Sequence, residues 1–222
     1  MPVYILENSV IQSLFTKLRD KRTPTNMFWQ LLKKLGYLMS FEVFHRENLS
    51  EKVEVETVFK RTSGIAFNKK ILIVEILRAA VPFASGAIDL ADDLGMPRVV
   101  GVVDAKRIEN SSTDGKKFDI EMRTFKVPHT TPDVPVIIYD PMLATASTMI
   151  ETVRRIKSQN GSNRIIAVSV VAAEYGVEKL LSEFPDINLY VLAVDREEDR
   201  GLNKIGYIVP GLGDCGDRAF GT

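Results

Sequence analysis

The chain has 222 residues, 45% of them hydrophobic and 26% charged, which is typical of one globular α/β domain that buries a sizeable core. Lysine plus arginine and aspartate plus glutamate each number 29, so bulk charge does not favour a nucleic acid as partner. The single cysteine, Cys215, excludes an intrachain disulfide, and with no membrane-length apolar run or signal peptide we expect a cytoplasmic protein.

The first fifty residues are predicted to be mainly helical, with helices over residues 7–20 and 24–46. In the second helix apolar residues such as Phe28, Leu31 and Leu35 recur at three- and four-residue steps. Thr25 or Asn26 is the expected cap. Residues 53–59 alternate between apolar and polar and predict a strand.

Five short apolar runs follow, and most are separated by helical patterns. The strands are predicted over residues 71–76, 98–105, 134–140, 165–172 and 188–194, and the helices over residues ending at about Leu94, 147–159 and 174–184. Polar residues 106–127 predict an exposed hairpin or arm, and the glycine-rich tail from Gly206 predicts an ordered loop. This order indicates an α/β fold with a mostly parallel central sheet flanked by helices.

Ligands of open α/β sheets bind beyond the carboxyl ends of the strands, and a strand, a short loop rich in hydroxyl groups and a helix meet there in "VIIYDPMLATAST". The free N–H groups and the dipole at the start of the helix favour an anion, and Thr145, Ser147 and Thr148 add hydroxyl donors. Asp140 would repel a phosphate but suits ribose hydroxyls beside it. The segment therefore predicts a sugar-phosphate site, with a capped turn that binds nothing as the alternative.

Arg78 ends another strand in "ILRAAVP", where its guanidinium can bind a phosphate with two donors. The alternative is a solvated arginine. No Walker pattern is present, and "GLGDCG" lies at the chain end without room for a helix behind it, so neither a nucleoside-triphosphate loop nor a dinucleotide turn is predicted.

Several of these segments together resemble the uracil phosphoribosyltransferases. "DPMLATAST" resembles their phosphoribosyl-diphosphate loop, "ILRAA" their diphosphate loop and "GYIVPGLGDCGDRAFGT" their uracil-binding stretch, while "LRDK" and "VEVET" also fit. The Ala-Ser form of the loop and "SVVAAEYGV" are similar to the archaeal branch. The resemblance covers nearly the whole chain in order.

This resemblance implies a single type I phosphoribosyltransferase domain over residues 1–222, with an N-terminal helical part (1–50), an arm (106–127) and a C-terminal uracil-binding hood (195–222). It implies pyrimidine salvage, in which uracil and 5-phospho-α-D-ribose 1-diphosphate (PRPP) give UMP and diphosphate. Mg²⁺ is expected, held mainly by PRPP and not by direct side-chain ligation. A homodimer or homotetramer is also implied.

The resemblance assigns residues to each part of the reaction. Asp140, Asp214 and Arg78 are expected to be catalytic, and Ile208, Gly213, Asp214 and Cys215 to bind uracil. PRPP is expected to contact Arg78, Arg107, Asp140, Pro141, Met142, Leu143, Ala144, Thr145, Ala146, Ser147, Thr148 and Asp214.

The chain departs from the family pattern at two places and leaves a third open. Many members have Gly-Gly where this chain has Ala146-Ser147, so the loop must keep φ below zero or hold strain. Cys215 replaces an expected alanine, and we expect a tolerated small hydrophobe rather than a nucleophile. In the arm, Lys106 and Arg123 are rivals to Arg107.

Other functions remain as alternatives. A purine enzyme of the same class is disfavoured because Tyr139, not a second acid, precedes Asp140, and an RNA-binding regulator is disfavoured by the balanced charge.

The resemblance to the archaeal branch also implies GTP and CTP as possible effectors. Lys33 and Lys34 are candidate phosphate contacts, and the simpler interpretation is that they lie on a solvated helix face.

Overall fold

The computed structural model describes residues 3–108, 116, 118–160 and 164–222. Its helices are α1 (Ser9–Arg19), α2 (Thr25–Arg46), α3 (Ala80–Asp93), α4 (Ser147–Asn160), α5 (Glu174–Glu183), α6 (Glu197–Arg200) and α7 (Cys215–Phe220). Its strands are β1 (Val3–Ile5), β2 (Glu51–Glu56), β3 (Arg61–Ala66), β4 (Ile71–Leu77), β5 (Arg98–Ile108), β6 (Asp119–Lys126), β7 (Val136–Tyr139), β8 (Met142–Leu143), β9 (Ile165–Val168), β10 (Val171–Ala173), β11 (Asn188–Val191) and β12 (Ala193–Asp195).

A seven-stranded sheet in the order β1-β11-β9-β7-β4-β5-β6 forms the centre of the molecule. Every neighbouring pair is parallel except β5 and β6, which are antiparallel at one edge. In the middle of the sheet Ile73 lies between Val100 and Ile137. The predicted α/β fold with a mostly parallel sheet is thus confirmed. Strand β1, which was not predicted, extends the opposite edge.

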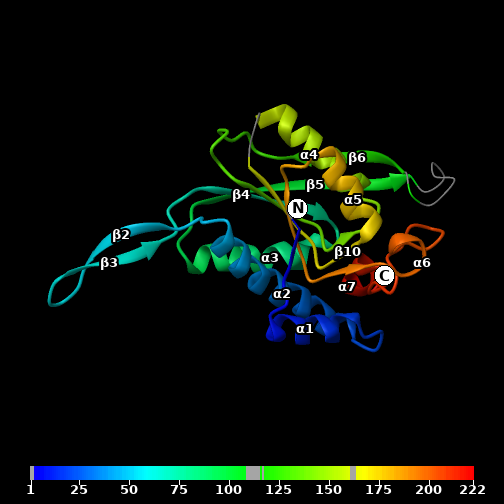
Figure 1. Ribbon diagram of the computed structural model, residues 1–222, viewed down its shortest axis with the longest axis horizontal. Coiled ribbons are helices and arrows are strands. Elements are labelled where there is room, and N and C mark those ends of the chain that lie inside the picture. Colours follow the sequence, from blue (N-terminus) through cyan, green and yellow to red (C-terminus); the bar gives the residue numbers. More distant parts are fainter. Residues whose placement is uncertain (1–2, 109–115, 117, 161–163) are drawn as a thin grey trace.

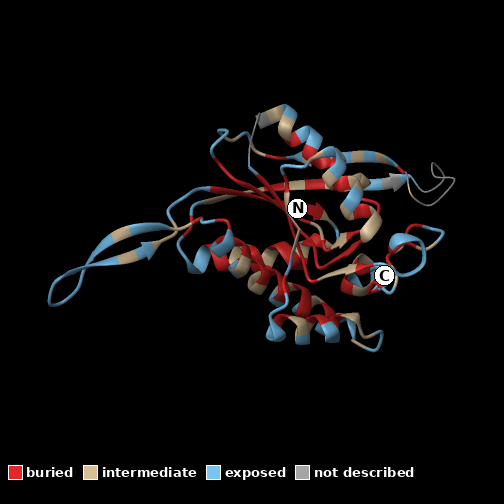
Figure 2. Cartoon of the chain, in the orientation of Figure 1, coloured by how far each residue is buried: buried red, intermediate tan, exposed pale blue. Residues whose placement is uncertain are grey.

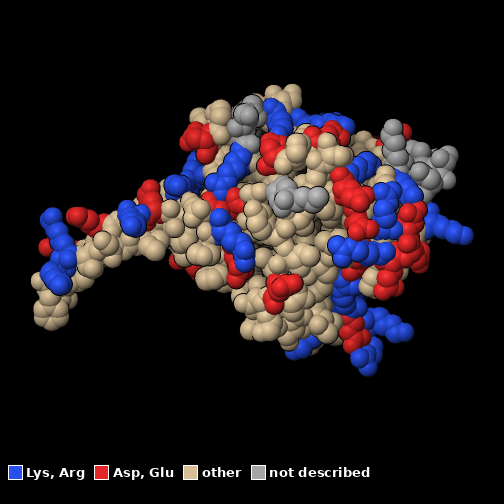
Figure 3. Space-filling model, in the orientation of Figure 1, with Lys and Arg blue, Asp and Glu red and all other residues tan. Residues whose placement is uncertain are grey.

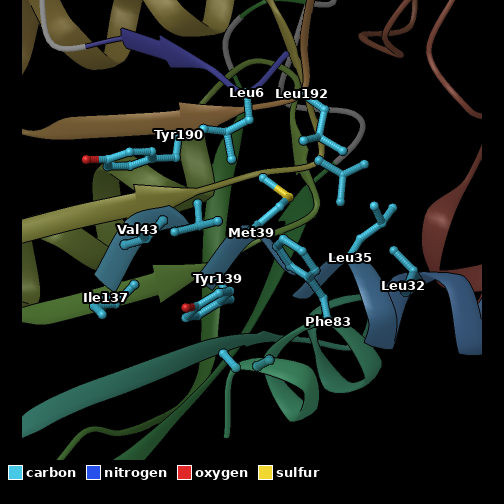
Figure 4. Packing of buried hydrophobic residues seen from close by; sticks show 14 of the residues in the cluster. Leu6, Leu32, Leu35, Met39, Val43, Phe83, Ile137, Tyr139, Tyr190 and Leu192 are labelled. Atoms are coloured by element: carbon cyan, nitrogen blue, oxygen red, sulfur yellow. The ribbon is translucent and has the colours of Figure 1, made fainter. Parts of the chain in front are cut away.

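The two faces of the sheet bury separate cores, because successive side chains of a strand point to opposite sides. Ile73 contributes to a core shared with α2 and α3, whereas Leu72 and Val74 contribute to a core shared with α4 and α5. Figure 1 shows the two pairs of helices on opposite sides of the sheet. Figure 4 shows the first core, in which Phe83 of α3 lies against Tyr139 of β7 with ring centroids 5.4 Å apart.

A second, three-stranded sheet in the order β12-β10-β8 continues from the carboxyl end of the first. The predicted strands 165–172 and 188–194 are each broken in two, so that β10 and β12 leave the central sheet and β10 pairs with both β8 and β12. The backbone N–H groups of Val170 and Val171 both donate to the carbonyl of Pro141 at the break. The second sheet therefore holds the segment after β7 beside the segments after β9 and β11.

The hairpin of β2 and β3 projects from the body of the molecule (Figures 1 and 2). The prediction of a strand over 53–59 is wrong at its end, because the chain turns after Glu56 and the hydroxyl of Thr57 accepts from the N–H groups of Phe59 and Lys60. At the turn Val58 and Phe59 are 93% and 95% exposed. Strand β3 was not predicted, since its polar residues show little alternation.

Strands β5 and β6 contain the described parts of the predicted arm and pair from Val102–Lys126 to Ile108–Asp119. The predicted turn residues 109–115 and 117 lie outside the described part. At the other end of the chain, α2 has Pro24 at its cap without a side-chain hydrogen bond, so the predicted Thr25 or Asn26 cap is wrong. Within the described ranges, no helix combines the length and apolar character needed to span a membrane.

Candidate active site

The predicted phosphate loop, residues 140–148, leaves the central sheet directly after β7. The N–H of Asp140 still donates to the carbonyl of Val168 at 3.1 Å, and the Asp140 carboxylate accepts from the N–H of Met142 at 3.2 Å. Burial raises the pKa of Asp140 to about 7, against the opposing effect of the Met142 N–H. The Asp140 carboxylate accepts this hydrogen bond from a backbone N–H and not from a cationic side chain. It can therefore interact with a ligand without first breaking an ion pair.

The loop turns into α4 at Ala146, whose φ is 60°. Its carbonyl accepts from the N–H of Ile150 at 2.9 Å and so begins the helical ladder. Of the two expectations for this position, φ below zero is wrong and a strained backbone is found, because a side chain in the left-handed region is disfavoured. The strained residue directly precedes the first turn of α4, whose N–H groups lack intrahelical acceptors.

Arg78 follows β4 across a cis peptide bond with Leu77. Its guanidinium lies 3.2 Å from the carboxylate of Asp217 and 3.4 Å from the hydroxyl of Thr222. The same group lies 5.4 Å from the centroid of the Phe220 ring. Arg78 therefore stands between the central sheet and the C-terminal residues rather than alone in solvent.

The tail is folded around a short helix rather than forming only a loop. Helix α7 starts at Cys215, and the side chain of Asp214 caps it by accepting from the N–H of Asp217 at 2.9 Å. The expectation that no helix had room after "GLGDCG" is thus wrong, because α7 begins within that segment. The other carboxylate oxygen of Asp214 accepts from the Tyr207 hydroxyl at 3.3 Å, and Gly213 supplies the left-handed φ of 81° just before the cap.

Cys215 is 3% exposed, and its thiol pKa is raised by burial and by the neighbouring carboxylates of Asp140 and Asp214. These causes favour the neutral thiol over the thiolate. The side chain thus has the properties of a small apolar wall.

Arg19 and Arg218 link the hood to the N-terminal helix α1 and its end by an ion pair and hydrogen bonds. Arg19 lies 2.6 Å from Asp195, which also accepts from the N–H of Gly211 at 2.8 Å. Arg218 donates to the carbonyls of Leu18, Asp20 and Leu212 at 3.0, 2.6 and 2.6 Å. The "LRDK" segment therefore fixes the position of the glycine-rich tail.

A first cavity of about 250 Å³ lies between the phosphate loop and the hood. Its lining includes the predicted residues Asp140, Met142, Leu143, Ala144, Thr145, Ala146, Ser147, Thr148, Ile208, Gly213, Asp214 and Cys215, together with Ala79, Ala105, Met149, Gly206, Tyr207 and Gly216. Segments that are distant in the sequence, the phosphate loop and the hood, thus share one cavity. Pro141 is not in the lining and instead accepts the two hydrogen bonds described above.

A second, adjoining cavity of about 590 Å³ brings Arg78 to the same place. It shares Asp140, Thr148 and Asp214 with the first cavity and adds Asp104, Lys106, Arg123 and Asp217, among others. Both rivals for the arm contact therefore line it. The side chain of Arg107 is outside the described part of the structure.

Among the lining residues that were not predicted from the sequence, Tyr207, Asp104 and Asp217 carry polar side chains. Tyr207 precedes Ile208 in the hood, and only the fold reveals that its hydroxyl reaches Asp214. Asp104 pairs in register with Leu77, the last residue of β4. It also lies next to the end of the predicted strand 98–105, and that position is the signal that could have found it, although β5 itself continues to Ile108. Asp217 lies on α7, which was not predicted, so the sequence did not show that this residue lines the second cavity.

The candidate effector residues lie on α2 and line neither cavity. The ammonium of Lys33 pairs with the carboxylate of Asp89 on α3 at 2.8 Å, and Lys34 is exposed. The structure thus gives Lys33 an ion-pair partner on the neighbouring helix, at the surface.

Comparison with known proteins shows which family the chain belongs to. Residues 5–222 match the family model described as uracil phosphoribosyltransferase. Uracil phosphoribosyltransferases from Pyrococcus furiosus and Thermococcus gammatolerans, both archaeal, are each 40% identical, over 99% of this chain and 90% and 93% of theirs. A solved structure, the AQ2163 protein from Aquifex aeolicus, has a TM-score of 0.82 at 28% identity, covering 98% of this chain and 97% of that one. The chain therefore belongs to the uracil phosphoribosyltransferase family, and it is a pentosyltransferase of pyrimidine salvage.

Proposed function

We propose that the two adjoining cavities are where PRPP and uracil react to form UMP and diphosphate. The observation that supports this most is the convergence of the phosphate loop, the turn after β4 and the hood on the shared residues Asp140, Thr148 and Asp214. A site for a sugar carrying an anion at each end needs such a two-part cavity.

The 5′-phosphate is assigned to the first turn of α4. Free N–H groups, the helix dipole and the hydroxyls of Thr145, Ser147 and Thr148 all favour an anion there. The diphosphate is assigned to the second cavity, where Arg78 and the arm cations Lys106 and Arg123 stabilise the charge that develops on the leaving group. Arg107 keeps its expected contact to diphosphate as part of this proposal.

Asp140 lies between these two anion sites and is assigned to the ribose. Breaking the anomeric C–O bond places positive charge on the ribose, and an ionised Asp140 offsets that charge and orients the hydroxyls. The rest of the barrier is lowered chiefly by positioning, because the reaction asks little covalent chemistry of the protein.

The carboxylates of Asp104, Asp140 and Asp214 line the second cavity and suit Mg²⁺ as oxygen groups, although no three acidic, histidine or cysteine side chains of the described residues lie together as a direct metal site. We assign the ion mainly to oxygens of PRPP, with these side chains contributing at most through water. When bound, it supplies positive charge to the diphosphate.

Uracil is assigned to the hood. Backbone groups around Gly213 can pair with the O4 and N3–H edge of the base, and Ile208 and Cys215 form apolar walls. Cytosine reverses the donor and acceptor on that edge, and the mismatch would strand buried polar groups. Asp214 faces both the base and the ribosyl donor.

The remaining partners are proposals as well. We propose a cytoplasmic homodimer or homotetramer, supported by the exposed apolar tip at Val58 and Phe59, with GTP and CTP as candidate effectors. Light scattering of the wild type and of Val58→Ser/Phe59→Ser tests the assembly, and an unchanged mass would exclude the hairpin as its surface. Figure 3 shows Lys and Arg interspersed with Asp and Glu on the face in view, so that face offers no large basic patch to a nucleic acid.

The assay that tests the function is formation of labelled UMP from uracil and PRPP, with Mg²⁺ and with a chelator, and with and without GTP and CTP. The proposal predicts that Asp140→Asn abolishes most of the UMP formed, while Lys157→Met on the outer surface does not. Equal UMP formation by Asp140→Asn would remove Asp140 from the site.

A further inference from the structure

Helix α5 packs against the phosphate loop more closely than a side chain would allow. A Cβ atom placed on Gly176 would lie 2.2 Å from the carbonyl oxygen of Ala144 and 2.9 Å from that of Leu143. Residue 176 must therefore be glycine for the helix to touch the loop backbone. Contacts of this kind make α5 a rigid support for the loop.

One turn further along the same face, Lys179 reaches the start of α4. Its ammonium lies 3.3 Å from the hydroxyl oxygen of Ser147, which lies 3.2 Å from the hydroxyl of Thr145. The ammonium also lies 5.7 Å from the centroid of the Tyr175 ring. A partly buried cation is thus held directly behind two hydroxyls of the phosphate loop.

Ser147 separates two cavities. It lines the first cavity and also a third one, of about 310 Å³, whose lining includes Lys179, Glu151 and Arg154. Among the acids of the third cavity, Glu183 and Glu151 lie 2.6 and 3.8 Å from Arg154. Lys179 thus approaches Ser147 from the side opposite to the proposed phosphate.

The direction of the hydrogen bond follows from the chemistry of the two groups. An ammonium has three donors and no acceptor, so Lys179 donates and the Ser147 oxygen accepts. The hydroxyl proton of Ser147 is then directed away from Lys179, toward Thr145 or into the first cavity, and a bound anion can accept it. Polarisation by the cation strengthens this donor.

We propose that Lys179 is a positioning residue for the 5′-phosphate of PRPP and UMP, which sets Ser147 as a donor toward that phosphate. This inference rests on the proposed function of the phosphate loop. It adds a residue that lies outside both substrate cavities. It also relates the close contact at Gly176 to the site, because that contact fixes the distance between Lys179 and Ser147.

Binding of UMP and of uridine, measured by calorimetry, tests the proposal without requiring turnover. Uridine lacks only the phosphate, so the ratio of the two dissociation constants reports the phosphate contribution. For Lys179→Met, which removes the charge but keeps most of the length, we expect about tenfold weaker UMP binding and uridine binding within about twofold of the wild type, since one hydrogen bond to a charged group is at stake. Lys179→Arg should restore most of the ratio, since it keeps a cationic donor.

Two further variants show how the residue acts. Ser147→Ala should weaken UMP binding, and Lys179→Met added to it should cost less than about twofold more, because the lysine acts through the serine. Lys157→Met is the matched control: this lysine on the outer part of α4 pairs with Asp186 and should leave both ligands unaffected. Thermal melting of each variant shows whether the fold is retained.

The outcomes separate the two claims. If wild-type protein binds UMP no better than uridine, the assignment of phosphate to this loop is wrong. If it prefers UMP and Lys179→Met keeps the full preference, or if the losses for Lys179→Met and Ser147→Ala simply add, the role of Lys179 is wrong while the loop assignment stands. A parallel rise in KM for PRPP, with KM for uracil unchanged, would support both.

Discussion

The guanidinium of Arg78 lies 3.2 Å from the carboxylate of Asp217, so the turn after β4 is linked to the C-terminal helix α7 across the second cavity. The two side chains are 55% and 53% exposed, and a pair of this kind contributes only about 0–1 kcal/mol to stability. Arg78 is therefore held near the proposed diphosphate position at little energetic cost, and a diphosphate can replace Asp217 as its partner.

Replacing Arg78 by alanine should raise the KM for PRPP roughly 10- to 100-fold, because a charge-assisted contact contributes about 1.5–3 kcal/mol. The KM for uracil should change little. Asp217→Asn is the control, since it removes the competing carboxylate and should leave the KM for PRPP equal or lower. Steady-state kinetics with each substrate varied in turn measures both, and an equal rise for uracil and PRPP after Arg78→Ala would indicate a structural arginine instead.

Asp140→Asn should remove most activity, because the amide cannot offset positive charge on the ribose. The wild-type kcat/KM for PRPP should rise with pH through about 7, where the free enzyme ionises this carboxyl group. Wild-type turnover by the Asp140→Asn variant, or a wild-type profile that stays flat on both sides of this pKa, would contradict the assigned role.

The same substitution should stabilise the ligand-free protein above pH 7. Burial raises the pKa of Asp140 from 3.8 to about 7, so the folded state binds more protons than the unfolded state between those values. Wild-type stability therefore falls as pH rises through this window, and the cost is complete above it. We expect Asp140→Asn to add about 2–4 kcal/mol at about pH 8 and nothing near about pH 4, as measured by urea unfolding. A stabilisation that is equal at both pH values would show that ionisation is not its cause.

Ala146→Gly should keep or slightly raise activity. Alanine holds φ of 60° here at a cost of the order of 1 kcal/mol, which glycine removes while adding a similar entropy to the unfolded chain. The two effects offset each other, so the midpoint of unfolding should move little. Complete loss of UMP formation would mean that the methyl group itself is needed.

Cys215→Ala should retain most turnover and the refusal of cytosine. The thiol is buried and its pKa is raised, so it is neutral and cannot act as a nucleophile at neutral pH. Iodoacetamide should accordingly leave the wild-type enzyme active near neutral pH. Rapid inactivation by this reagent, with protection by uracil, would show a reactive thiolate.

The central sheet could be predicted because strands buried on both faces leave continuous apolar runs such as "VIIY", and because Asp140 visibly ends that run. The division of residues 165–172 into β9 and β10 could not, since an apolar run has no mark where the chain leaves one sheet for another. The hydrogen bonds from Val170 and Val171 to Pro141 mark that break in the structure.

The candidate residues of the phosphate loop and the hood could be named because their segments resemble those of a known family, whereas contacts between the segments could not be predicted. The link from Tyr207 to Asp214, that from Arg78 to Asp217 and that from Lys179 to Ser147 depend on how elements that are separate in the chain meet. The strained φ of Ala146 was one of two open possibilities, because composition alone does not decide whether a loop holds strain.

The most direct test of the account is a competition of uracil, 5-fluorouracil, cytosine and hypoxanthine for one limiting pool of PRPP. If backbone groups of the hood hydrogen-bond to the O4 and N3–H edge of the base, both uracil and 5-fluorouracil should be substrates, since C5 lies off that edge. The enzyme should reject cytosine by on the order of a thousandfold, because the mismatch leaves buried groups unpaired. Asp214→Ala should lower turnover with both accepted bases to a similar extent. Cytosine or hypoxanthine nucleotide formed at rates near that of UMP would contradict both the base-reading argument and the assignment of this cavity to uracil.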